Sequence, residues 1–112
     1  MTTITQIQLV APAQLGNADA SVYSAPTQAT ARVGRAVFTN TTASAVTITA
    51  GITTGGALTA ATTVIAARSV AAGESYVSPE LSGAVIPAGS SLRAYANAAA
   101  SITLMVSGLL IQ

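Results

Sequence analysis

The chain has 112 residues, of which 6% are charged, and its formal net charge is +1; an average soluble domain has about 25% charged residues. It contains no histidine and no cysteine, so it lacks the usual general base, the usual thiol nucleophile and the preferred zinc ligands. The only acidic residues, Asp19, Glu74 and Glu80, are scattered along the sequence. We therefore expect no enzymatic activity, no catalytic residue, no cofactor and no metal site.

The length predicts one domain over residues 1–112. Alanine, threonine and serine fill nearly half of the positions, so part of the surface must consist of these small side chains. A nearly uncharged surface protects weakly against association, which favours a subunit that packs against copies of itself or a larger body. The only basic residues are four dispersed arginines. They form no basic patch, and we expect no nucleic-acid partner.

The first predicted strand is Ile4–Val10, in which apolar residues alternate with glutamines. Pro12 should end this strand, because proline cannot donate a hydrogen bond to a sheet. Residues 1–12 are interpreted either as the first strand of the domain or as an arm that adds to a neighbouring sheet. Val22 and Tyr23 form a short second strand that ends before Pro26.

The next predicted strand, Ala29–Thr39, contains a conflict in its alternation. Arg35 falls on the same side as Val33 and Val37, although one side of the strand should be buried. A β-bulge at Gly34 would shift the alternation and remove the conflict.

The clearest alternation of the chain occurs in Ala45–Ala50, where valine and isoleucine alternate with threonine. Gly55 and Gly56 then indicate a turn. An alternative helix over Ala57–Ala72 is disfavoured, because this segment is rich in β-branched residues and has no apolar stripe at helical spacing. The remaining predicted strands are Thr62–Ala67, Glu74–Ser78, Ser91–Asn97 and Ser101–Ile111.

Two similar segments, VAAGESY over residues 70–76 and IPAGSSL over residues 86–92, predict two similar turns. In each turn a glycine, Gly73 or Gly89, would supply a positive φ. The stretch Ala94–Ile111 has no charge, but its second half alternates; it therefore favours a strand over a membrane helix. Short strands separated by turn residues predict an all-β fold of about 8 strands, an antiparallel β-sandwich.

The C-terminal half resembles a class of small structural proteins from tailed-bacteriophage virions, of the capsid decoration or cement type. Residues 69–110 run SVAAGESYVSPELSGAVIPAGSSLRAYANAAASITLMVSGLL. They contain AAGE followed by an aromatic residue, then Leu-x-Gly, AGSSLRA and an alternating strand that ends in VSG. The segment RAVFTN over residues 35–40, ahead of Val46-Thr47-Ile48, is similar to the first half of the pattern. The resemblance covers residues 20–111 and does not extend to residues 1–15.

This resemblance implies a jelly-roll or Ig-like sandwich and a non-enzymatic role in the virion, on the capsid surface. The implied partners are a major capsid protein or another virion protein, and further copies of the chain, as a trimer rather than a dimer. The alternative is a receptor-binding or adhesion module of a phage tail or fibre, or another small tail or neck component. We expect no membrane partner. The predicted interface residues are Ile4, Gln6, Gln8, Arg32, Arg35, Tyr76 and Tyr95.

Overall fold

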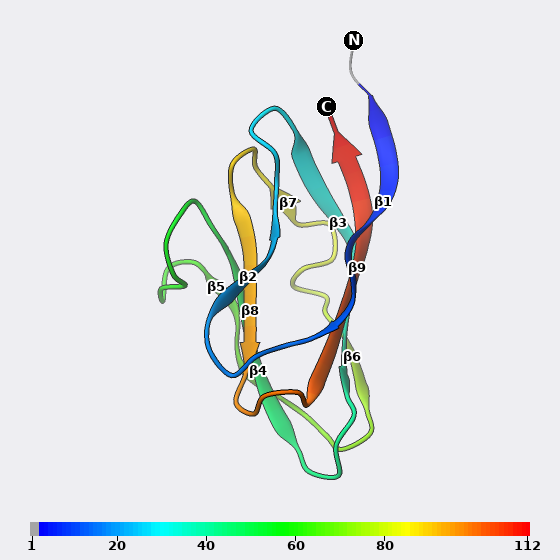
Figure 1. Cartoon of the computed structure of the whole chain (residues 1–112), viewed down its shortest axis with the longest axis vertical. Helices are drawn as coiled ribbons and strands as arrows, with labels where there is room; N and C mark the ends of the chain where they lie inside the picture. Colours follow the sequence, from blue (N-terminus) through cyan, green and yellow to red (C-terminus); the bar gives the residue numbers. More distant parts are fainter. Residues whose placement is uncertain (1–2) are drawn as a thin grey trace.

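The protein is a sandwich of two antiparallel β-sheets in the computed structural model, which describes residues 3–112 (Figure 1). Met1 and Thr2, the first residues of the predicted arm, lie outside the described residues. The strands are β1 (Ile4–Gln14), β2 (Ala20–Ser24), β3 (Thr30–Asn40), β4 (Val46–Thr53), β5 (Thr63–Val70), β6 (Ser75–Val77), β7 (Val85–Ile86), β8 (Ser91–Ala96) and β9 (Ile102–Ile111).

The larger sheet has the strand order β1–β9–β3–β6, with β7 also paired to β3, and the smaller sheet has the order β2–β8–β4–β5. The chain crosses from one sheet to the other between most consecutive strands, and the first and last strands pair with each other. This is the strand order of a jelly roll. The predicted all-β sandwich is therefore confirmed, and of the two expected variants it is the jelly roll.

The core lies between the two sheets and is built from alternate residues of the long strands. In β9, Ile102, Leu104 and Val106 are buried, as the alternation of the sequence predicts. The single phenylalanine, Phe38, is fully buried in β3. Burying a side chain of this size stabilises a fold by roughly 1.5–3 kcal/mol.

The predicted bulge at Gly34 is present in β3. The pairing of β3 with β9 shifts between Val33 and Arg35, so Val33 is buried and Arg35 is exposed. The predicted glycine turns are confirmed as well, because Gly73 and Gly89 both have positive φ angles.

Two sequence-based expectations about strand ends were wrong. Pro12 does not end the first strand, since β1 continues to Gln14. β1 is an edge strand, and its pairing with β9 shifts between Val10 and Ala13. Pro12 therefore lies where no backbone hydrogen bond to β9 is required. The strand expected to end at Ala50 continues to Thr53, because its pairing with β8 continues through Ile52 and Thr53. The preference for a strand over a helix within residues 57–72 is confirmed, because β5 occupies the second half of that segment.

Asn40 begins the polar segment Asn40–Ser44, yet its side chain is fully buried at the end of β3. Its Nδ2 donates hydrogen bonds to the carbonyls of Ser44 and Val70, at 2.8 and 2.9 Å. Its Oδ1 accepts from the backbone N–H and the hydroxyl of Thr42, at 2.9 and 2.7 Å. Asn40 therefore holds the 40–44 turn against β5 with its polar atoms satisfied.

Candidate functional site

The outer face of the larger sheet carries most of the predicted interface residues. Paired residues on antiparallel strands point to the same side of a sheet, so the register defines this face. One row crosses β1, β9 and β3 as Gln6, Leu109 and Arg32, and the next as Gln8, Ser107 and Arg35. We call this surface the open face; its side chains belong to Ile4, Gln6, Gln8, Arg32, Arg35, Val37, Val77, Val85, Met105, Ser107, Leu109 and Ile111.

Large apolar side chains are concentrated on the open face. The side chains of Ile4, Val77 and Val85 are 62%, 45% and 51% exposed. Leu109 and Ile111 on the same face are half-buried. The other strongly exposed large apolar residue of the described chain is Val64 on β5. Exposed apolar residues gathered on one face are typical of an interaction surface.

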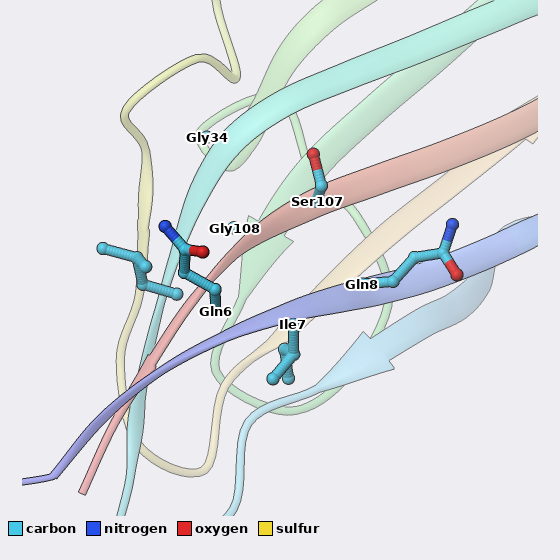
Figure 2. Close-up of a pocket in the computed structure, with 7 residues that line it drawn as sticks. Gln6, Ile7, Gln8, Gly34, Ser107 and Gly108 are labelled. Atoms are coloured by element: carbon cyan, nitrogen blue, oxygen red, sulfur yellow. The ribbon is translucent and has the colours of Figure 1, made fainter.

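The centre of the open face is hollowed where the backbone carries glycine. Two adjoining hollows of about 530 and 320 Å³ share Gly34 and Leu109 in their linings. Figure 2 shows the larger one, with Gln6 and Gln8 from β1 beside Ser107 from β9. A side chain at Gly108 would overlap the carbonyl oxygen of Arg32, so the tight pairing of β3 and β9 under the hollow requires glycine there.

The charge of the open face is positive and unbalanced. In residues 3–112, neither the Arg32 nor the Arg35 guanidinium takes part in an ion pair or hydrogen bond. Two of the three acidic residues are engaged elsewhere: Asp19 pairs with Arg93, and Glu80 accepts a hydrogen bond from Tyr76. The open face can therefore bind carboxylates of a partner, and arginine does so with two parallel hydrogen bonds.

Tyr76 lies apart from this group, at the edge of the sandwich where β5 and β6 face each other. The Arg68 guanidinium lies over its ring, 4.4 Å from the centroid, and its hydroxyl donates a hydrogen bond to Glu80. Burial raises the pKa of Tyr76, and the Glu80 carboxylate raises it further. The hydrogen bond from Tyr76 lowers the pKa of Glu80 below its usual value. These contacts close the edge of the core beside Phe38.

Tyr95 lies on the opposite outer face, that of the smaller sheet, where it pairs with Thr49. We call this surface the covered face, because the 54–62 loop packs on it. Asp19 ties the loop down: one carboxylate oxygen accepts from the Leu58 N–H at 2.8 Å, and the other from Arg93 Nε at 2.8 Å. The covered face consists of Thr47, Thr49, Gly51, Thr53, Ser91, Arg93 and Tyr95.

The Asp19 contacts determine its ionisation. Partial burial raises the pKa of Asp19, but the Leu58 N–H and the Arg93 guanidinium together outweigh burial. The pKa of Asp19 therefore lies below its usual value, and the carboxylate is charged at neutral pH.

The structure thus brings together five of the seven predicted interface residues, Ile4, Gln6, Gln8, Arg32 and Arg35, and separates Tyr76 and Tyr95 from them and from each other. Sequence reasoning missed Met105, Leu109 and Ile111. The alternation of β9 placed Met105 opposite the core residues, but it could not show that β1 and β3 flank β9 and complete a surface.

Within residues 3–112, His, Cys, Asp and Glu form no group of three or more that could hold a metal ion. Residues 3–112 form no helix that is long and apolar enough to span a bilayer.

Searches with the sequence found no matching family among protein-family descriptions and no match among curated proteins. Solved structures of a viral capsid do resemble the fold. A structure of the Gx strain of infectious bursal disease virus matches 99% of this chain with a TM-score of 0.57 and 20% sequence identity. The VP2 subviral particle of the same virus matches 98% with a TM-score of 0.55 and 17% identity. Its T13 viral particle gives a TM-score of 0.56 at 14% identity.

These matches establish a shared fold. The chain spans about a third of the length of the solved chains, 32%, 32% and 30% respectively. In each of those structures the matched jelly roll is part of a longer chain.

Proposed function

We propose that this chain is a non-enzymatic structural protein of a virion, a decoration or cement protein of a tailed-bacteriophage capsid. The observation that carries the proposal is the match of 98–99% of the chain to jelly rolls from capsid particles. The absence of histidine and cysteine from the sequence and the resemblance of residues 69–110 to small phage virion proteins support it.

In this proposal the open face contacts the capsid lattice. Its exposed Ile4, Val77 and Val85 would be removed from water at the contact, with a gain of roughly 25 cal/mol per Å² of apolar surface buried. Arg32 and Arg35 would meet carboxylates of a major capsid protein. A protein that binds only the assembled lattice stabilises that lattice by mass action, which is how a cement protein works.

The test is the composition and stability of purified particles. A decoration protein should be present in copy numbers comparable to those of the major capsid protein, and particles that lack it should break at a lower temperature. Raising salt from about 0.05 to 1 M should release little of it, because screening weakens charge pairs and not apolar contacts. A few copies per particle, or complete release by salt, would contradict the proposal.

The alternative, a receptor-binding or adhesion module of a tail, fibre or neck, has less support. Such a module would bind its ligand in a groove lined by aromatic residues, for which Tyr76 and Tyr95 are the candidates. The two residues lie on different parts of the sandwich, and neither lines the two hollows of the open face.

A further inference from the structure

The outer edge of β1 carries backbone groups that are aligned for another strand. Thr3 and Gln112 exchange two backbone hydrogen bonds, both 2.8 Å long. In an antiparallel ladder, hydrogen-bonded pairs alternate with pairs whose backbone groups point away from each other. With the register Ile4↔Ile111 to Gln8↔Ser107, the N–H and C=O groups of Ile4, Gln6 and Gln8 therefore point away from β9.

These outward groups have no partner in the described chain. β1 is the last strand of its sheet, and outside the ladder with β9 no hydrogen bond of residues 3–112 involves Ile4, Gln6 or Gln8. Residues 4–8 contain no charge and no proline, and their register is regular up to Gln8.

The other three sheet edges are protected in the ways that natural proteins use against strand pairing. On β5 the register shifts twice, Ala67 has a positive φ, and Arg68 adds a charge. β2 has five residues with a register shift. β6 and β7 have three and two residues. Only the first half of β1 is left open among the described edges.

From this geometry we infer that two copies of the chain associate through β1, antiparallel about a two-fold axis at Gln6. Gln6 is the middle of the regular run from Ile4 to Gln8, so this axis places Gln6 opposite Gln6 and Ile4 opposite Gln8 of the second copy. All three outward residues are then hydrogen-bonded pairs, and each pair exchanges two bonds. The two larger sheets become one continuous sheet, and their open faces lie side by side.

The charges do not oppose this arrangement. Arg32 and Arg35 lie on β3, two strands from the axis. With strands about 4.8 Å apart, the arginine strands of the two copies are roughly 24 Å apart, which is more than twice the Debye length of about 8 Å at physiological salt.

A two-fold contact uses the same surface on both copies and closes at two. The inference therefore replaces the trimer expected from the sequence with a dimer. It does not depend on the proposed function, because the pairing takes place in solution without a virion.

The experiment measures the mass of the purified full chain by sedimentation over a concentration series up to about 1 mM, a limit that still detects weak association. The wild-type chain should form a dimer. Gln6→Lys places two like charges opposite each other at the axis and should leave only monomer. Gln14→Lys adds the same charge to the same strand, beyond the two register shifts between Gln8 and Ala13, and should remain dimeric.

A second pair of variants tests the register of the two strands directly. The chain has no cysteine of its own, so a single introduced cysteine can form a disulfide only with the same residue of another copy. Across the axis, Gln6→Cys would bring two Cα atoms to about 5.5 Å, within disulfide range, and should form a cross-linked dimer on mild oxidation. Gln14→Cys should not. A wild-type monomer up to about 1 mM, a wild-type trimer, or a dimer that Gln6→Lys leaves intact would overturn the inference. Retention of the protein on virions has no bearing on it.

Discussion

The two outer faces of the sandwich differ in what lies on them. On the covered face, Gly51 and Thr53 are buried under the 54–62 loop, which Asp19 holds through Leu58. On the open face, large apolar side chains and two arginines lie on the outer side of the larger sheet, and no segment of the described chain covers them. The same fold thus covers one face with its own loop and leaves the other exposed. The following experiments test this difference, beginning with the largest expected effect.

Gly108→Ala should destabilise the protein most, by about 2–3 kcal/mol, because the new methyl group would overlap the Arg32 carbonyl and force β3 and β9 apart. The measurement is the free energy of unfolding from urea titration. Gly34→Ala is the matched control in the same hollow. Its methyl group would lie 3.3 Å from the Ser107 carbonyl, so it should cost less than about 1 kcal/mol. Equal losses would show that β3 and β9 are not packed as described.

Gly51→Ala tests the covered face. The added methyl group would overlap the Thr62 carbonyl and lie 2.7 Å from Leu58 Cδ2. The loop can move aside more easily than a central strand, so we expect a smaller loss, about 1–2 kcal/mol. Residues 54–62 should also become sensitive to protease in the folded protein. A loss of stability without any new cleavage would contradict the covering role of the loop.

Asp19→Asn should lower the free energy of unfolding at pH 7 by about 1 kcal/mol, the value expected for a partly exposed ion pair. The pKa of Asp19 is lower in the folded than in the unfolded protein. Its contribution is therefore complete above the unfolded pKa of about 3.9 and is lost as the pH falls through the folded pKa.

The difference in stability between wild type and Asp19→Asn, measured by urea titration from pH 7 downward, should consequently shrink below about pH 4. Comparing the two proteins cancels the similar contribution of Glu80, whose pKa is also lowered. A difference that stays constant at acid pH would rule out the Asp19 carboxylate as the group that holds the loop.

Replacing Arg32 and Arg35 together by alanine should change the free energy of unfolding least, by less than about 0.5 kcal/mol, since neither side chain has a charged partner in residues 3–112. Attachment to particles should nevertheless weaken. Arg68→Ala is the control: it removes one arginine from the stack on Tyr76, away from the open face. If both variants are released from particles equally, or if neither is, Arg32 and Arg35 do not contribute to attachment.

The local pattern of the sequence was sufficient to predict much of the fold. The alternation of β9 and the turn glycines Gly73 and Gly89 follow from the two-residue period of a strand and from the low cost of positive φ for glycine. The conflict between Val33 and Arg35 located the bulge at Gly34 before any pairing was known. In each case one short stretch of sequence contains the whole physical cause.

Tertiary structure alone decided the features that depend on distant residues. Asn40 is buried because Val70, thirty residues away, offers it a carbonyl. Pro12 stays within β1 because that strand is at a sheet edge. Period two shows that Gln6 and Arg32 lie on outward faces, yet only the pairing of both strands with β9 places them in one row. An alternating pattern describes the two sides of a single strand, whereas a surface is defined by which strands lie next to each other.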